Sequence, residues 1–131
     1  MSIDVIGNLL TIIRNGIMAS KPFVIVPHSK MNSSIVQILK NEGFIRDFAE
    51  QSAEDTRKNI KIFLKYVDGE SVIHEITRIS KPSLRKYAGH KKVKPVIGGL
   101  GVSILTTNKG IMTNRKAKEL SVGGEVICTV W

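Results

Sequence analysis

Two stretches in the N-terminal half repeat their apolar residues at the spacing of an amphipathic helix. The first covers Ile3 to Ile13, and Gly16 is expected to end it. The second follows Ser29, whose hydroxyl suits an N-cap, and runs to Asn41 before a closing Gly43. The pattern therefore predicts two helices packed on a common core.

Short apolar runs around these helices predict β-strands instead. Asp68-Gly69 is typical of a hairpin turn and favours strands on both of its sides, although Ile73, Ile76 and Ile79 also fit a helical spacing. Residues 51–58 are polar and indicate a loop. The expected strands are Phe23–Val26, Phe44–Phe48, Asn59–Val67 and Ser71–Ser80.

The pattern changes at Lys81-Pro82, since proline disfavours helix in the residue before it. We therefore expect an N-terminal α/β subdomain at residues 1–80 and a C-terminal, mostly β subdomain at residues 81–131. Thr113 can cap the one short helix expected there. The whole chain is predicted to be α+β, with further elements at Leu84–Tyr87, Val102–Leu105, Ile111–Met112, Asn114–Leu120 (the helix) and Val126–Trp131.

Charge is distributed unevenly along this chain. Residues 76–118 contain eleven of the twenty Lys and Arg residues and no Asp or Glu, whereas the other 88 residues sum to −2. The net charge of +9 thus comes from one third of the molecule. A field of one sign repels itself unless a partner neutralises it, and nucleic acid is the common polyanionic partner.

Composition indicates a folded domain in a reducing compartment. With 42% apolar residues, 131 residues can bury a core, and no apolar run approaches the roughly 20 residues that span a bilayer. The first residues resemble neither a secretory signal nor an Arg-rich transit peptide. Cys128 has no second cysteine to pair with. We expect a cytosolic or organelle-matrix protein that is monomeric when free.

The sequence lacks the groups of residues that catalysis or metal binding would need. His28, His74 and His90 are scattered without metal-ligand spacing, and the basic region has no carboxylate or cysteine. Gly98 to Gly101 precedes a strand and opens no helix, so it does not indicate a dinucleotide site. The sequence predicts no enzyme, no cofactor and no metal.

The side chains of the basic region favour structured RNA. Tyr87 is its single aromatic residue, which argues against a stacking platform for single strands, although Tyr87 could stack or sit half-buried. Thr106 to Asn108 are small and polar and precede Lys109-Gly110, a pattern that suits a shallow minor groove. On composition alone this loop fits a solvated turn better, and a DNA-architectural protein remains a rival.

Motifs along the whole chain resemble the bacterial-type family of ribosomal protein eight of the small subunit. The most specific is Gly99-Leu-Gly-Val-Ser-Ile-Leu-Thr-Thr-Asn-Lys-Gly-Ile-Met-Thr, followed by Gly123-Gly124-Glu125. Ile12-Ile13-Arg14-Asn15-Gly16, Ser29-Lys30-Met31 and Lys81-Pro82-Ser83-Leu84-Arg85-Lys86-Tyr87 match in order.

The resemblance implies a non-catalytic protein without a cofactor that binds the central domain of small-subunit rRNA and helps that domain to fold. It also implies contact with small-subunit proteins five and twelve and, in some bacteria, translational repression through the operon messenger RNA. The residues that it places at the RNA are Thr106, Thr107, Asn108, Lys109, Gly110, Tyr87, Arg85, Lys86, Gly124, Glu125, Arg14, Asn15, Ser29 and Lys30.

Two positions depart from the family pattern. The loop usually reads Ser-Thr-Ser-Lys-Gly, so Asn108 replaces a hydroxyl by a longer amide. Lys118 stands where Arg is common and lacks its planar fork. Because RNA repels a carboxylate, we expect Glu125 to orient a Lys or Arg side chain or the amides of the loop.

Overall fold

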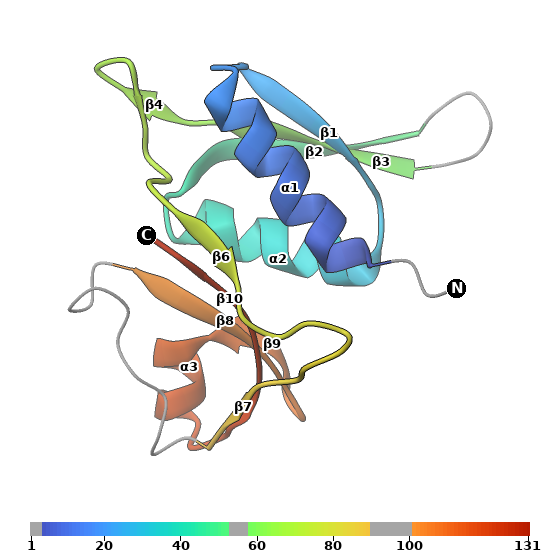
Figure 1. Cartoon of the computed structure of the whole chain (residues 1–131), viewed down its shortest axis with the longest axis vertical. Coiled ribbons are helices and arrows are strands. Elements are labelled where there is room, and N and C mark those ends of the chain that lie inside the picture. Colours follow the sequence, from blue (N-terminus) through green and yellow to red (C-terminus); the bar gives the residue numbers. More distant parts are fainter. Residues whose placement is uncertain (1–3, 53–57, 90–100) are drawn as a thin grey trace. The chain divides into compact units, whose positions relative to one another are not determined.

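The computed structural model describes residues 4–52, 58–89 and 101–131. It divides into two compact units, residues 1–73 and residues 74–131, which we call the N-unit and the C-unit (Figure 1). The division lies before the boundary expected between residues 80 and 81, because Ile76–Arg78 (β6) pairs with the last strand of the chain. Both units combine helix with antiparallel strands, which confirms the α+β class.

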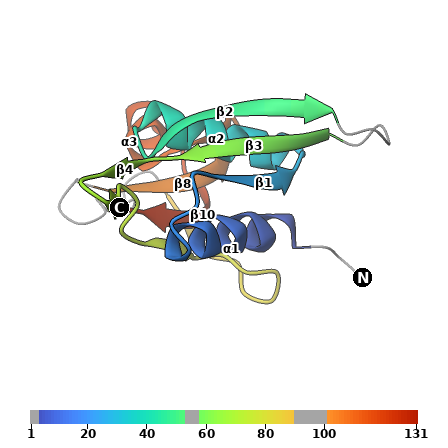
Figure 2. The same ribbon diagram turned by 90° about the horizontal axis from the view of Figure 1, so that it is seen from above.

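The N-unit is a three-stranded antiparallel sheet with two helices. Its strands stand in the order β1-β3-β2, so β3 is central and β1 and β2 form the edges. Helix α1 packs against β1, α2 against β2, and the helices against each other; Figure 2 shows α1 as a layer beside the strands. The elements are α1 (Val5–Met18), β1 (Phe23–Pro27), α2 (Lys30–Asn41), β2 (Ile45–Ser52), β3 (Lys58–Leu64), β4 (Tyr66–Val67) and β5 (Glu70–Ser71).

Local sequence explains where the helices begin. The carboxylate of Asp4 accepts a hydrogen bond from the Gly7 amide at 3.1 Å, and Ser29 Oγ accepts one from the Asn32 amide at 3.0 Å. Both bonds satisfy amides that the first helical turn leaves unpaired. The predicted α2, with its Ser29 cap, is therefore confirmed. The core residues below 2% exposed are Leu9, Leu10, Ile13, Val26, Ile35, Val36, Leu39, Ile60 and Ile62.

Two sequence predictions for the N-unit are wrong. Gly16 does not stop α1: it is buried inside the helix, where an added Cβ would lie 2.3 Å from Val24 Cγ1. Asp68 and Gly69 do form a turn with positive φ values of 52° and 80°, as predicted. The strand expected to follow it is only Glu70–Ser71, because the later part of that run pairs in the C-unit.

The C-unit is built around its last strand, β10. The strand order is β6-β10-β8-β9, and β7 also pairs with β10. The predicted cap of α3 is confirmed, since Thr113 Oγ1 accepts from the Lys116 amide at 3.2 Å. After β6, the elements are β7 (Tyr87–Ala88), β8 (Val102–Thr107), β9 (Gly110–Thr113), α3 (Asn114–Glu119) and β10 (Gly124–Val130).

The interior of the C-unit includes the single cysteine. Cys128 is 0% exposed on β10 and pairs in register with Arg78 of β6 and Ile104 of β8. Burial raises the pKa of its thiol to about 12, against a smaller opposing effect of Arg78. Cys128 is thus a small core residue, as expected. The basic segment from Lys91 and the glycines before Gly101 lie outside the described residues.

Candidate nucleic-acid interface

The first two residues of β10 gather distant segments at one end of the C-unit sheet. Gly124 pairs with Ala88 of β7 on one side and Thr107 of β8 on the other. Glu125 pairs in the same way with Tyr87 and Thr106. Three segments therefore lie side by side: the segment around Tyr87, the 106–110 loop and residues 124–125. We call residues 85–87, 106–110 and 124–125 the sheet-end cluster.

The loop between β8 and β9 is a tight turn held by Thr107. Its hydroxyl donates to the carbonyl of Gly110 at 2.8 Å and accepts from the amide of Lys109 at 3.1 Å. Gly110 adopts a φ of +113°, which a side chain would strain. A hydroxyl has one proton and two lone pairs, so one lone pair of Thr107 remains for an outside donor. Thr107 thus shapes the loop and can only accept from a partner.

The tip of this turn is open to solvent. Asn108, Lys109 and Gly110 are exposed, whereas Thr106 and Thr107 are half-buried. An amide at the tip offers two donors and an acceptor to a partner, and the ammonium beside it offers a positive charge. Asn108 is accordingly the side chain of the loop best placed for directional contacts.

An ion pair fixes the charged part of the cluster. Arg85 Nη1 donates to Glu125 Oε1 at 2.7 Å, and the Glu125 side chain is only 15% exposed while that of Arg85 is 52% exposed. The carboxylate is therefore largely enclosed, and the guanidinium stays accessible. The pair is the contact that the expected orienting role of Glu125 requires, and that role itself stays a prediction.

A buried serine positions the segment that carries Arg85. Ser80 is 3% exposed, and its hydroxyl accepts from the Lys86 amide at 2.7 Å and donates to the Lys86 carbonyl at 3.2 Å. The same carbonyl accepts from the Val126 amide of β10 at 2.8 Å. Sequence reasoning missed Ser80, because its only signal is a polar residue before Lys81-Pro82.

Tyr87 is the aromatic surface of the cluster. Its side chain is 72% exposed, although its backbone pairs with Glu125 in the sheet. This decides against a half-buried strand residue and leaves the ring open to solvent. An exposed ring of this size offers a stacking surface to a base or ribose.

Close packing explains the glycine pair at the start of β10. A Cβ on Gly124 would lie 2.1 Å from the carbonyl oxygen of Thr106, and one on Gly123 would lie 2.4 Å from that of Ala88. Both contacts are with backbone atoms, which cannot turn away. Gly124 is therefore required by the close approach of β8, and Gly123 by that of Ala88 and Gly89, whatever else approaches this surface.

The remaining candidate residues belong to the N-unit and are not part of the sheet-end cluster. Arg14 and Asn15 are exposed on α1, and Lys30 is exposed at the start of α2. Ser29 is the N-cap of α2, so its hydroxyl already has a structural role. In the N-unit these residues lie on two different helices, α1 and the start of α2.

Two other functional classes find no support in the described ranges. Over residues 4–52, 58–89 and 101–131, no three His, Cys, Asp or Glu side chains gather in a way that could hold a metal ion. In the same part of the chain, no helix is both long enough and apolar enough to cross a bilayer.

Comparison with known proteins identifies relatives over nearly the full length. Residues 4–131 match the family described as Ribosomal protein S8. The chain is 48% identical to small ribosomal subunit protein uS8 of Marinobacter nauticus, covering 98% of this chain and 97% of the relative. It is 50% identical to the uS8 protein of Burkholderia lata, covering 97% and 96%. It is 47% identical to that of Pseudomonas paraeruginosa, covering 98% and 97%.

Proposed function

The chain belongs to the ribosomal protein S8 family, which is structural and not enzymatic, and from this premise we propose that it is a structural component of the small ribosomal subunit. Its partner is the central domain of the small-subunit rRNA, which it binds directly and helps to fold, in the cytoplasm or in an organelle matrix. The observation that carries this proposal is the gathering of residues 85–87, 106–110 and 124–125 at one end of a single sheet.

The shape of the cluster suits a helical RNA. The turn at Asn108-Lys109 is narrow and exposed, so it can enter the wide, shallow minor groove of A-form RNA. There Asn108 hydrogen-bonds base edges or 2′-hydroxyls, Thr107 accepts one hydrogen bond, and Lys109 contacts phosphate. Arg85 and Lys86 add further phosphate contacts, and Tyr87 stacks on an exposed base or ribose.

Glu125 fits this scheme as a positioning residue. A carboxylate that faced phosphates alone would weaken binding, but the carboxylate of Glu125 is largely enclosed and paired with Arg85. The pair holds the guanidinium in one direction before RNA arrives, which lowers the entropy lost on binding. A base amino group can donate to the second carboxylate oxygen.

Further partners follow from the same proposal. Small-subunit proteins five and twelve are the expected protein neighbours. A protein that recognises the shape of an RNA helix also binds any other RNA that presents the same helix. The operon messenger RNA is therefore the expected second ligand. By binding it, the protein would repress its own translation. Arg14, Asn15 and Lys30 of the N-unit supply secondary RNA contacts.

Chemical footprinting of the purified protein on its own small-subunit rRNA tests the proposal. We expect protection confined to one helical region of the central domain, and competition by a structured RNA but not by duplex DNA of equal length. Equal competition by the two duplexes would instead favour a general binder of phosphate backbones. Protection outside the central domain would contradict the assignment of the binding site.

A further inference from the structure

The edge strand β1 leaves a row of backbone groups unpaired. In an antiparallel pair, residues alternate between bonding the neighbour and pointing away from it. Pro22 and His28 bond β3, since Leu64 N donates to Pro22 O at 3.0 Å and His28 N donates to Lys58 O at 2.9 Å. By alternation, the N–H and C=O groups of Phe23 and Ile25 point away from β3, and no described residue bonds them.

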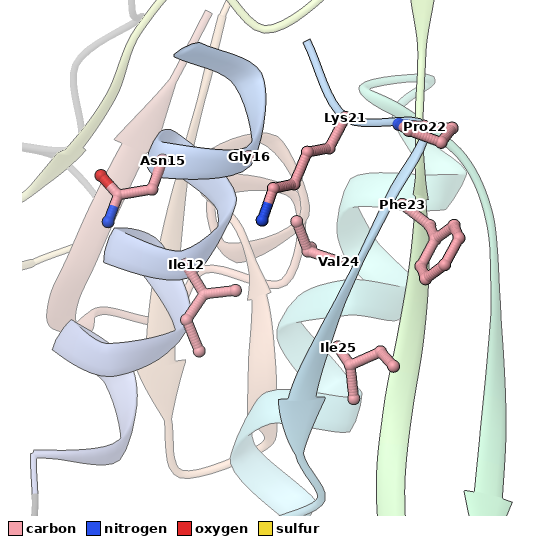
Figure 3. A pocket seen from close by; sticks show the side chains of 8 residues that line it. All are labelled: Ile12, Asn15, Gly16, Lys21, Pro22, Phe23, Val24 and Ile25. Atoms are coloured by element: carbon pink, nitrogen blue, oxygen red, sulfur yellow. The ribbon is translucent and has the colours of Figure 1, made fainter. Parts of the chain in front are cut away.

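An apolar depression lies along this free edge. It measures about 540 Å³ and lies between α1 and β1, lined by Ile12, Asn15, Val24 and Ile25 among others. Figure 3 shows Ile12 and Asn15 on the helix, with the Lys21 ammonium reaching into the space between helix and strand. Phe23 and Ile25 are 37% and 48% exposed, so apolar surface continues onto the outer face of the strand.

We propose that this edge accepts an extended segment of another protein of the small subunit as a fourth strand of the N-unit sheet, an inference that rests on the proposed function. The free amides and carbonyls of Phe23 and Ile25 supply the main-chain hydrogen bonds of strand addition. Side chains on one face of the added strand pack on Ile12, and those on the other face pack on Phe23 and Ile25.

The chemistry of the edge favours a peptide over RNA. Donors and acceptors alternate along it at the spacing of a strand, and most of the side chains that line the depression beside it are apolar. On the outer face, the Lys61 ammonium lies 4.0 Å from the centroid of the Phe23 ring, whereas an RNA site needs several cations. Among the described residues that line the depression, Lys21 carries the one charged side chain. The segment should therefore alternate apolar side chains and carry a carboxylate opposite Lys21.

Substituting proline at position 25 tests strand addition while leaving the fold of the N-unit intact. The Ile25 amide does not bond β3, so Ile25→Pro removes the donor at the free edge without breaking a hydrogen bond to β3, at a position where strands tolerate proline. It also removes apolar side-chain surface, a loss that the control shares. Ile25→Thr is the matched control, because it keeps the amide and the β-branched shape. Both variants should retain wild-type helical and sheet content by circular dichroism and wild-type affinity for the isolated rRNA central domain.

The readout is made in assembled small subunits. Amide hydrogen exchange at Phe23, the free-edge amide that all three chains keep, should slow about tenfold or more on assembly for wild type and for Ile25→Thr, but not for Ile25→Pro. A photoreactive benzoyl-phenylalanine at position 23 should cross-link to a polypeptide. A cross-link to rRNA, or unchanged exchange in subunits that contain the wild-type chain, would overturn the inference and leave the proposed function standing. A chain that enters no subunit and binds no rRNA would overturn both.

Discussion

The two units differ in whether the residues that stabilise the fold are also the ones that hold the proposed RNA-binding residues. In the N-unit the core is closed by α1 and α2, and the candidate RNA-contacting residues are exposed on helix surfaces or serve as a cap. In the C-unit one strand, β10, closes the core through Cys128 and also holds the exposed cluster through Gly124 and Glu125. Damage to β10 should therefore affect both properties of the C-unit, whereas surface changes in the N-unit should affect only binding.

The largest expected effect comes from replacing a packed glycine in each unit. Gly124→Ala places a Cβ 2.1 Å from the backbone oxygen of Thr106 and should cost about 3 kcal/mol or more, because overpacking against a backbone cannot relax. Gly16→Ala meets side-chain atoms only, Val24 Cγ1 at 2.3 Å and Leu64 Cδ1 at 3.3 Å, and the helix gains up to about 1 kcal/mol from alanine. Its net cost should be about 1–2 kcal/mol. Urea unfolding measures both values.

Thiol labelling tells which unit is destabilised. Cys128 is the only cysteine and is fully buried in the C-unit, so its labelling requires that unit to open. Gly124→Ala should accelerate labelling strongly, and Gly16→Ala should not. The assay should be run near pH 8. Because burial raises the pKa of the Cys128 thiol from about 9 to about 12, the protonated thiol contributes fully to the stability of the fold below about pH 9. This contribution is lost as the pH rises toward 12. Equal acceleration by both substitutions would mean that the units open together.

The next effect separates two residues of one loop. Thr107→Val keeps the shape but removes both hydrogen bonds of the hydroxyl, so it should lower C-unit stability by about 1–2 kcal/mol and weaken cognate RNA binding. Thr107→Ser keeps the hydroxyl and should restore most of both properties. Thermal unfolding and filter binding measure them. Wild-type stability in Thr107→Val would show that the turn does not depend on this side chain.

How much of each unit the sequence predicts depends on how far apart in the chain the contacting residues lie. Ser29, Thr113 and Asp68-Gly69 act on residues within a few positions, so their caps and turn were predictable. The run after Gly69 was assigned to the wrong partner, because Ile76 pairs with Val130 and nothing local encodes that register. Gly16 was wrongly predicted to end α1. Its close contact with Val24 is tertiary, so the local sequence does not show why a glycine stands there.

The candidate site follows the same rule. The 106–110 loop stood out in the sequence because its turn is local, and Tyr87 stood out as the single aromatic residue of the basic region. The resemblance added Glu125 and assigned all three to the RNA without saying why they belong together. Their proximity needs the pairing of β10 with both β7 and β8. The exposure of Tyr87 and the burial of Ser80 were likewise beyond reach, since both depend on the packing of remote strands. The RNA contacts of these residues remain predictions.

A smaller effect is expected at the tip of the loop. Asn108 is exposed, so Asn108→Ala should leave thermal stability unchanged and lower cognate affinity by about 1 kcal/mol, roughly fivefold, for each lost hydrogen bond. Asn108→Ser restores the hydroxyl common in the family and should bind at least as well as Ala. Filter binding to cognate and unrelated RNA measures the effect. An equal loss on both RNAs would contradict a recognition role.

The sharpest test of the C-unit is Glu125→Gln, for which only a small effect on stability is expected. The substitution keeps the shape and removes the charge. Because Arg85 is half exposed and water screens the pair, the stability change should stay below about 1 kcal/mol. If the carboxylate orients Arg85, cognate affinity should fall, and Arg85→Gln should add little to that fall in the double variant, since both changes remove one pair. Filter binding of the four proteins completes the cycle. If affinity instead rises in Glu125→Gln, repulsion between carboxylate and phosphate outweighs positioning, and β10 contributes to recognition through its backbone alone.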